Sequence, residues 1–484
     1  MTRRMTRILT VALLLSGCSM TPRYERPALP VAANFPEATV REPGDATLPS
    51  VDYKAILQDE RLQKLIAEAL VSNRDLRIAA ANIAAARAQY QIQRAERLPL
   101  IGNANNVAIV DAGTGRNNIG GSPVAGGQRE NFSVGIGVTQ FEIDLFGRLA
   151  ALSRAEQARY FASEVGGRAT RLTLIGDIAT NWLRYAADES LRAIAEQTVS
   201  SAESSVRLTR ARLDGGIAPL TDVAQAETIL ATAQSDLAVQ TTALAQDINA
   251  LRLLIGEEVD AALLPSGIAD AGKTIAELPS GLESIILLRR PDVVQAEYLL
   301  RAANAQVGAA RAALFPRLSL TVLGGLGSNA LSQLFTTRAF NYTLIPGMNY
   351  PIFAGGRNRA NLAQARAQFD AAVAGYERAI QIAFREVADA LARRSTINAQ
   401  LDAQQRLARA AADTFRLSDA RYRGGIDPFL ANLDAQRSLY QAQRSLVATQ
   451  LVAANNRVTL YRTLGGDALV EGTANGPVVP PTPQ

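Results

Sequence analysis

The hydrophobic and polar positions of this chain follow two periods, and the longer period predicts helices. From 356 to 423 the apolar residues advance in steps of 4 and 3, as in a coiled-coil seam, through Phe369, Val373, Tyr376, Ile380, Ala383 and Val387. A similar series runs through Val165, Ala169, Leu172, Gly176, Ala179, Leu183 and Ala186. Both series lie in long stretches without Pro and rich in helix-forming residues. The pattern predicts very long helices that pack in a coiled-coil bundle or wall.

Each long helix is predicted to end in a tight turn and to fold back as a helical hairpin. The second tip, 424–428, begins with two Gly residues, which favour the left-handed conformation that ends a helix. It continues with Asp427 and Pro428, which suit the N-cap and the first position of the next helix. The first tip, 215–219, repeats the arrangement with Ala218 in place of Asp.

Between the helical stretches the period changes to 2, which predicts β-strands. Phe132, Val134, Ile136 and Val138 alternate with small or polar residues. Four such strands are predicted, at about 100–110, 131–141, 317–326 and 338–350. Each has one apolar and one small, polar face, and roughly 10 residues are needed to cross a bilayer as a tilted strand. We therefore expect two transmembrane strands in each half of the chain.

The chain contains an internal duplication. The segment from Arg207, RLTRARLDGGIAPL, matches the segment from Arg416, RLSDARYRGGIDPF, at an offset of 209 positions, and the offset is 217 further upstream. The difference of eight residues falls within 111–129, the predicted outer loop. An internal repeat of this size is a whole structural half. The halves are 51–256 and 282–465, joined by a linker at 257–281.

Four membrane strands cannot form a closed barrel, and open strand edges are not tolerated in hydrocarbon. Several copies of the chain must therefore share one barrel. Two copies would give eight strands, whose interior is filled by side chains, whereas three copies would give twelve and leave a lumen. A conducting tube therefore needs at least a trimer. The predicted fold is an α+β membrane protein with duplicated halves, and a homotrimer with a twelve-stranded β-barrel is the smallest assembly that leaves a lumen.

Composition argues against an enzyme and against a nucleic-acid-binding protein. The chain has no His and a single Cys, which removes the commonest general base and metal ligand and leaves no intrachain disulfide. Arg3, Arg4 and Arg7 carry three of the +5 formal charges, so the rest of the chain carries +2. Its Arg residues are interleaved with acids rather than gathered in a basic stripe. We expect no catalytic residue, metal or cofactor, and no nucleic-acid partner.

The N-terminus has the form of a secretory signal peptide over 1–17, with Arg residues followed by a short apolar run. Residues 15–18 read Leu-Ser-Gly-Cys and resemble a bacterial lipobox, whose Cys is acylated and becomes the first mature residue. Ser19 rather than Asp follows, which in such lipoproteins implies the outer membrane. We therefore predict a covalent lipid on Cys18, outer-membrane lipid as a partner, and a lipidated, Pro-rich segment at 18–50.

The duplicated halves resemble the outer-membrane efflux proteins of tripartite drug pumps, the TolC-like family, and especially its lipoprotein branch, often called the NodT type. The most specific stretch is RYRGGIDPFLANLDAQRSLYQAQ at 421–443. The resemblance implies a trimeric channel whose β-barrel stands on a periplasmic α-barrel, with an equatorial belt that includes 257–281 and parts of the tail at 466–484. It also implies passive conduction of drugs or other small solutes. The implied partners are a periplasmic membrane-fusion adaptor and an inner-membrane transporter of the resistance-nodulation-division class.

The resemblance also implies site residues. The periplasmic aperture of the family corresponds here to Leu430, Asp434 and Arg437, where three copies of Asp434 would form a ring of negative charge. The first half has Gln225 and Thr228 at the positions of Asp434 and Arg437. The tips that dock on the adaptor correspond to Gly216, Ile217, Ala218, Gly425, Ile426 and Asp427.

Two other readings stay open from the sequence. The first is an outer-membrane duct for type I protein secretion, which would have the same architecture. The second is a periplasmic coiled-coil scaffold lipoprotein without a pore, because Ala-rich helical seams occur in both kinds of protein.

Overall fold

The computed structural model describes residues 19–36, 51–111, 117–119, 122–124, 128–277, 283–473 and 476–477. The predicted signal peptide and Cys18 lie outside the described residues, as do parts of the predicted outer loop and the C-terminal tail. The chain forms two compact units. Unit 1 contains Met1–Arg26, Ile83–Ala162 and Ala296–Gly375, and unit 2 contains Pro27–Asn82, Ser163–Gln295 and Tyr376–Gln484. Each unit draws on both sequence repeats, so the duplication does not fold as two separate domains.

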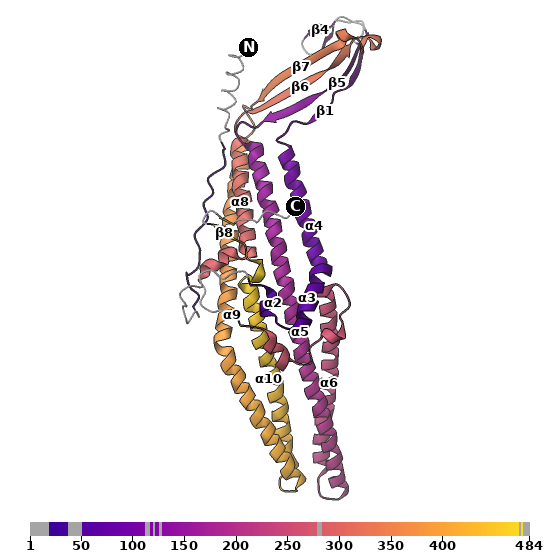
Figure 1. Ribbon diagram of the computed structural model, residues 1–484, viewed down its shortest axis with the longest axis vertical. Helices are drawn as coiled ribbons and strands as arrows, with labels where there is room; N and C mark the ends of the chain where they lie inside the picture. Colours follow the sequence, from indigo (N-terminus) through magenta and orange to yellow (C-terminus); the bar gives the residue numbers. More distant parts are fainter. Residues whose placement is uncertain are drawn as a thin grey trace. The chain divides into compact units, whose positions relative to one another are not determined.

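The repeats are visible in the lengths of the main helices (Figure 1). Helix α4 (Arg74–Ala95) and helix α8 (Pro291–Ala312) have 22 residues each. Helix α5 (Arg148–Asp214) and helix α9 (Arg357–Arg423) have 67 residues each. The offsets between their first residues are 217 and 209, the values found in the sequence. The last pair, α6 and α10, has 36 and 35 residues and spans Leu220–Ile255 and Phe429–Thr463.

The remaining helical elements are short. They are α2 (Tyr53–Ile56), α3 (Glu60–Ser72), α7 (Ile268–Ala271) and the 3₁₀ turns η1 (Ala261–Leu263), η2 (Gly272–Thr274), η3 (Ser284–Arg289), η4 (Leu331–Gln333), η5 (Thr337–Ala339) and η6 (Gly466–Ala468). The linker predicted at 257–281 contains η1, α7 and η2.

The helix ends of the two repeats share their backbone conformation. Gly216 at the first tip and Gly425 at the second have φ angles of 72° and 73°. Gly256 and Gly465, which follow α6 and α10, have φ angles of 86° and 92°. These angles lie in the left-handed region, which Gly adopts without the steric cost that other residues have. The matching Gly residues therefore fix the same chain reversals in both halves.

One antiparallel sheet in unit 1 contains the four predicted strand regions, in the order β1-β5-β6-β7, with β2 also on β5. Its strands are β1 (Ile101–Asn103), β2 (Asn106–Asp111), β5 (Gln128–Ile143), β6 (Arg317–Ser328) and β7 (Phe340–Asn349). Two further hairpins pair β3 (Asn117–Ile119) with β4 (Ser122–Val124) and β8 (Gly472–Thr473) with β9 (Gly476–Pro477). The stretch predicted as one strand at 100–110 is interrupted between β1 and β2. Both pieces pair with β5 in one register, since Asn103 faces Ile136 and Asn106 faces Ser133.

The two faces of this sheet differ in chemistry. Val138, Val322 and Leu344 are cross-strand neighbours on one face, which is apolar along most of its length. A β-bulge lies between Val138 and Phe141, where Gln140 has a φ angle of 56°. The extra residue moves the apolar positions of β5 from even to odd numbers, so Phe141 stays on the apolar face.

The opposite face is lined by small residues where β5 and β6 meet. Gly135 faces Gly325 on this side. A Cβ atom at Gly325 would lie 2.4 Å from the carbonyl oxygen of Val134, and a Cβ atom at Gly137 would lie 2.1 Å from that of Val322. Side chains do not fit at such distances, so the strands approach closely only because Gly occupies these positions. Gly324, on the apolar face, has no atom within 4 Å of its Cβ position.

The core of unit 2 lies along α5. Trp182 is fully buried, and its indole N–H donates a hydrogen bond of 3.0 Å to the carbonyl oxygen of Leu263. The part of the predicted seam on α9 within this unit is buried too, with Tyr376, Ile380 and Val387 each at 0% exposure. The spacing of 3 and 4 residues that predicted a helical seam therefore corresponds to the buried stripe of α9.

Candidate channel aperture and hairpin tips

The predicted aperture residues share one face of α10, close to the second tip. Leu430, Asp434 and Arg437 are exposed, with Leu430 at 54%. The opposite face of the same turns is buried and contains Phe429 and Leu433. The spacing of 4 and 3 residues puts the three exposed side chains on one line along the helix. The structure therefore brings the predicted aperture residues together on one surface.

The charges of this surface interact only weakly within one chain. Arg437 Nη1 lies 4.0 Å from Asp434 Oδ1, and the two side chains are 55% and 65% exposed. Water and salt screen such a pair, which contributes little to stability. The equivalent residues of the first repeat, Gln225 and Thr228, carry no charge. At these equivalent positions only the second hairpin carries an acid.

Asp427 does not cap α10, so that prediction is wrong. The N-cap is Pro428, and its side chain accepts no hydrogen bond. The carboxylate of Asp427 instead accepts two hydrogen bonds from Arg421, at 2.6 Å from Nε and 2.8 Å from Nη2. These hydrogen bonds hold the pKa of Asp427 below its usual range. Asp427 binds the Arg421 guanidinium group rather than the backbone N–H groups of α10, because a bidentate, charge-assisted pair is the stronger interaction.

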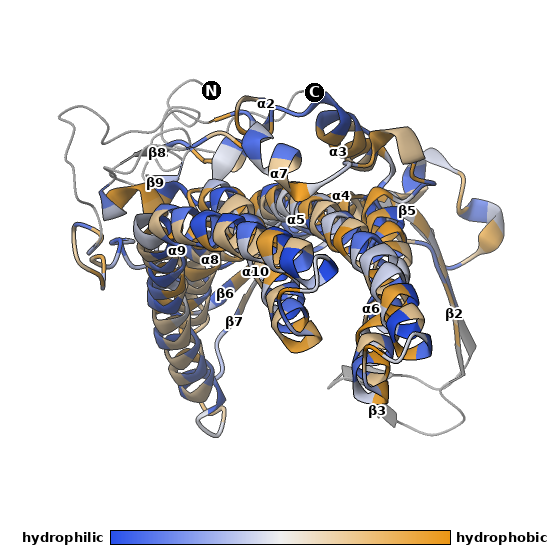
Figure 2. Ribbon diagram, turned by 90° about the horizontal axis from the view of Figure 1, so that it is seen from below, coloured by the Kyte–Doolittle hydropathy of each residue, from blue (hydrophilic) through white to orange (hydrophobic). Residues whose placement is uncertain are grey.

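Each hairpin tip presents an apolar side chain to solvent. Ile217 is 79% exposed and Ile426 is 66% exposed. Gly216 and Gly425, which precede them, hold the left-handed conformation described above. Ala218 and Asp427 follow, so the second tip alone carries an acid. In Figure 2, hydrophilic and hydrophobic residues are interleaved along α6 and α10, the helices that follow the tips.

A polar contact that the sequence did not reveal joins the two hairpins further along. Tyr440 Oη on α10 donates a hydrogen bond of 2.5 Å to Asp236 Oδ2 on α6, and Arg444 Nη1 donates one of 3.3 Å to the same oxygen. Partial burial and the nearby carboxylate raise the pKa of Tyr440 to about 12. The equivalents of Tyr440, Asp236 and Arg444 in the other repeat are Ala231, Ser445 and Ser235, so the available signal was a charged or aromatic residue in one repeat only.

A carboxyl pair between α5 and α6 was also missed. Asp247 is 2% exposed, and its Oδ1 lies 3.1 Å from Arg184 Nε. Burial, together with hydrogen bonding to and repulsion by Asp188, holds the pKa of Asp247 well above its usual range, although Arg184 opposes the shift. The second repeat has Asn456 at the position of Asp247.

In unit 1 the segment 19–26, which we call the N-terminal strap, is bound through a buried acid. Glu297 on α8 has a side chain 1% exposed and accepts hydrogen bonds from Arg26, at 3.2 and 2.8 Å, and from Tyr24, at 3.2 Å. Arg154 on α5 donates to the Oγ of Ser19, at 3.0 Å. A Cβ atom at Gly147 would lie 3.7 Å from the Cα of Ser19, so this residue rests at the start of α5.

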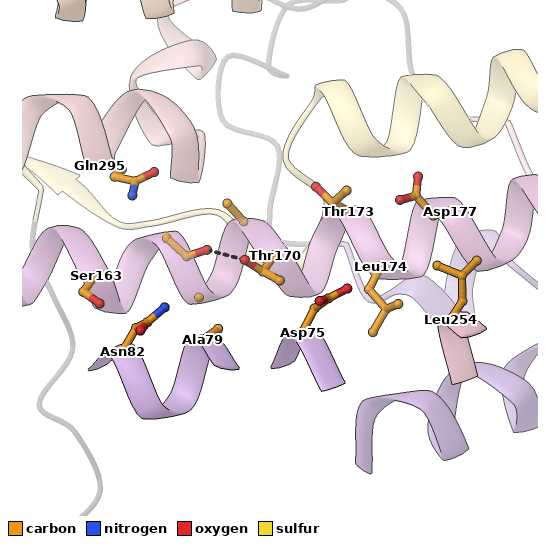
Figure 3. A pocket seen from close by; sticks show the side chains of 13 residues that line it. Asp75, Ala79, Asn82, Ser163, Thr170, Thr173, Leu174, Asp177, Leu254 and Gln295 are labelled. Carbon is orange, nitrogen blue, oxygen red and sulfur yellow. Dashed lines mark hydrogen bonds between the residues drawn. The ribbon is translucent and has the colours of Figure 1, made fainter. Parts of the chain in front are cut away.

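Unit 2 has a cavity of about 490 Å³ beside α5, lined by both polar and apolar residues (Figure 3). Asp75 and Asn82 line it from α4, Thr170 and Asp177 from α5, and Gln295 from α8. Thr170 donates its hydroxyl hydrogen to the backbone carbonyl of Gly166, 3.1 Å away. The lining therefore combines carboxylates, amides and hydroxyls, and the Thr170 hydroxyl is directed back to its own helix.

No cluster of three or more potential metal ligands occurs in the part of the chain that the structure describes. Among the described helices, none has the length and apolar character needed to cross a membrane.

Comparison with known proteins identifies the family. The family model for outer membrane efflux proteins matches residues 65–257 and 282–466. This chain belongs to the outer membrane efflux protein family. The matched segments lie in the two sequence repeats.

Individual relatives agree with this family. TtgC, a probable efflux pump outer membrane protein of Pseudomonas putida, is 39% identical over 474 residues, with 96% of each chain covered. OprJ, an outer membrane protein of Pseudomonas aeruginosa, is 39% identical over 464 residues, with 95% of each chain covered. The open state of the MtrE outer membrane channel of Neisseria gonorrhoeae has a TM-score of 0.83 at 33% identity, covering 93% of this chain and 99% of that chain.

These matches confirm the predicted family, the outer-membrane location and the role in efflux. The family is one of transport proteins rather than enzymes, and relatives such as TtgC are components of efflux pumps. The efflux role argues against a periplasmic scaffold without a pore. The described fold, long helices and a β-sheet, is the fold of the solved outer-membrane channels.

Proposed function

We propose that three copies of this chain form one twelve-stranded barrel, through which drugs or other small solutes pass from a tripartite pump to the exterior. The observation that carries this proposal is the sheet of unit 1, which has four strand positions, open edges and an exposed apolar face. Ile136, Tyr342 and Leu344 on that face are 68%, 78% and 61% exposed. Apolar residues at such exposure are unfavourable in water and suit contact with lipid.

The edges of the sheet support closure by further copies. The β1/β2 strand and β7 are the outer strands among the described members of this sheet. All neighbours in the sheet are antiparallel, so β7 of one copy would lie antiparallel to β1/β2 of the next. Four strand positions from each of three copies give twelve, enough for a lumen, whereas eight give a filled barrel. The small face rich in Gly suits the concave interior.

Helix α4 also supports an assembly. It contains 22 residues and has no buried residue in the isolated chain. Its apolar residues include Ile78 and Ile92, each 58% exposed. A helix is stabilised mainly by packing of its apolar face, and in one copy the packed face of α4 is only half-buried. Contact with a neighbouring subunit would complete this packing.

We further propose that Cys18 carries lipid and anchors the protein to the outer membrane. The strap supports this proposal, because it holds Ser19, the residue after Cys18, beside Gly147. Ile143 lies four residues before Gly147. It pairs with Leu318, which pairs with Met348, and these three residues form the last cross-strand row of the apolar face. Acyl chains on Cys18 would therefore start near the edge of the surface proposed to face lipid. Two or more acyl chains give a stable anchor.

For the aperture we propose Leu430, Asp434 and Arg437, and for the adaptor-docking surface the two tips. The exposed line of the first set and the exposed apolar side chains of the second agree with these roles. The partners proposed are a periplasmic adaptor and a proton-driven inner-membrane transporter. Relatives named for toluene and antibiotic efflux support organic solutes as the transported class.

The proposal is tested by assembly and conductance. The protein purified in detergent should run as a heat-resistant trimer and should form ion-conducting channels in planar bilayers. A species of one copy that is stable in water without detergent, and inactive in bilayers, would refute the barrel.

The lipid anchor has its own test. Cys18→Ala should abolish metabolic labelling with palmitate, with Ser19→Ala as the labelled control. Label retained on Cys18→Ala would refute acylation at this position.

A further inference from the structure

Arg212 and Arg421 occupy the same position in the two repeats but bind different partners. Arg421 is paired within its own tip with Asp427, as described above. The residue equivalent to Asp427 in the first tip is Ala218, so Arg212 has no acid at that place. Among the described residues Arg212 forms no salt bridge. The two repeats therefore have equivalent arginines, of which only Arg421 has an acid at the matching tip position.

Arg212 reaches across to the second hairpin instead. Its Nη2 donates hydrogen bonds to the carbonyl oxygens of Tyr422, at 2.8 Å, and of Arg423, at 3.3 Å. Its guanidinium carbon lies 4.2 Å from the centre of the Tyr422 ring, a cation–π contact. Tyr422 and Arg423 are the last two residues of α9. Both carbonyl groups lie at the negative end of the helix, which attracts a cation, and that of Tyr422 also accepts a hydrogen bond of 3.0 Å from the N–H of Gly425.

The contact borders an apolar cluster to which both hairpins contribute. Tyr422 is 3% exposed, and its ring packs on Phe429, with ring centres 5.3 Å apart. The cluster joins side chains of α5, α6, α9 and α10: Ala202, Val206, Ala226, Ile229, Tyr422, Phe429 and Leu433. Phe429 and Leu433 alternate along α10 with the proposed aperture residues Leu430 and Asp434. A shift of Tyr422 would therefore be transmitted to the aperture face.

We propose that Arg212 is a positioning residue of the channel: without an acid at position 218 to bind it, it holds the second hairpin against the first. This inference rests on the proposed aperture, because the held hairpin carries Leu430, Asp434 and Arg437. Release of Arg212 from α9 frees the second hairpin to move outward and widens the passage between subunits.

The decisive variant is Ala218→Asp, which gives the first tip the acid that the second tip has and leaves Arg212 unchanged. The introduced carboxylate is expected to bind Arg212 within the first tip, as Asp427 binds Arg421, and to withdraw it from Tyr422. Arg212→Ala removes the contact directly, and Arg212→Lys retains one donor and should give an intermediate effect. Arg210→Ala is the matched control, because Arg210 is exposed and pairs with Glu227 of its own hairpin.

Two measurements on the full-length trimer test the effect of these variants on the hairpins and on the pore. Spin labels at Arg207→Cys and Arg416→Cys, equivalent exposed positions on α5 and α9, report the distance between the hairpins when labelled subunits are diluted with unlabelled ones. Planar-bilayer recordings report conductance. Ala218→Asp and Arg212→Ala should shift the distances to larger values and raise conductance, and Arg210→Ala should do neither. Loss of a charged hydrogen bond should change the ratio of the two hairpin arrangements about tenfold.

Combining the variants separates this mechanism from general disturbance of the tip. Arg212→Ala together with Ala218→Asp should have no larger effect than Arg212→Ala alone, because both act on one contact. Wild-type distances in Ala218→Asp, or additive effects in the double variant, would overturn the assignment. A wild-type trimer that does not conduct would refute the proposed pore, and the distance measurement would still decide the role of Arg212. Heat-resistant trimers verify folding of each variant.

Discussion

The two repeats of this chain have nearly the same backbone and different side-chain chemistry. Their long helices have equal lengths, and their chain reversals occur at equivalent Gly residues with nearly equal φ angles. Their charged residues differ: the second tip has Asp427 where the first has Ala218, and α10 has Asp434 where α6 has Gln225. The residues that determine helix ends were kept after the duplication, while those that form contacts between hairpins diverged. The asymmetry between the repeats therefore indicates where the functional chemistry lies.

The largest effect is expected where the two repeats meet in the sheet. Gly325→Val would place a side chain against the carbonyl oxygen of Val134, 2.4 Å from its Cβ position, and should prevent β5 and β6 from pairing. We expect no heat-resistant trimer on gel electrophoresis. Gly324→Val is the control on the opposite face, where the Cβ position is open, and should assemble. Equal assembly of both variants would show that the close approach is not required.

The next largest effect is expected at Asp434, whose equivalent in the first repeat is the uncharged Gln225. Asp434→Ala should raise single-channel conductance in planar bilayers, because it removes the acid from the proposed ring of three. Gln225→Ala, the equivalent change in the first hairpin, should leave conductance unchanged. An Asp434→Ala channel that conducts like the wild type would remove this residue from the aperture.

A smaller effect, equal in the two repeats, is expected from substitution of the left-handed Gly residue in each hairpin tip. Gly216→Ala and Gly425→Ala each place a Cβ atom on a left-handed residue with no neighbouring atom within 4 Å. The strain should destabilise each turn by about 1–2 kcal/mol. Hydrogen exchange of the tip amides should increase by a similar factor in both variants. Clearly unequal factors would contradict the view that the two turns are structurally equivalent.

The smallest effect concerns the carboxyl pair of the first repeat. The pKa of Asp247 is raised in the folded state, so this group binds a proton more tightly there than in the unfolded chain. Its contribution to stability is therefore present at low pH and lost as pH rises from the unfolded pKa through the folded pKa. Asp247→Asn, which copies Asn456 of the second repeat, should remove this pH dependence. The difference in melting temperature between pH 5 and pH 8 should shrink by at least about 2 °C.

Most of the fold follows from the sequence, because it depends on local patterns. The heptad series on α9 corresponds to its buried stripe, and the alternation at 132–138 corresponds to β5. The bulge at Gln140 was not predicted, although the change from even to odd apolar positions between Val138 and Phe141 was a signal for it. The interruption between β1 and β2 had no such signal, since the register on β5 continues across it.

The contacts between distant segments were not predictable in the same way. The strap depends on Glu297, which is 271 positions from Arg26, and the sequence between them does not specify this pairing. Asp427 has the residue type of an N-cap, but a nearby Arg421 binds it more strongly. Arg212 could have been singled out only by noting that its duplicated acid is missing. Pairings of this kind depend on which helices become neighbours, and that depends on the whole fold.

The strap has a consequence for the order of folding. Residues 19–26 are synthesised before any other part of the described chain, but their main contact, Glu297, lies beyond the middle of the sequence. The strap can therefore bind Arg154 of the first repeat early, but it lacks its buried acid until the second repeat has formed α8. Docking of the strap on α8 is therefore among the last folding steps, and a chain truncated before α8 would leave Tyr24 and Arg26 without Glu297.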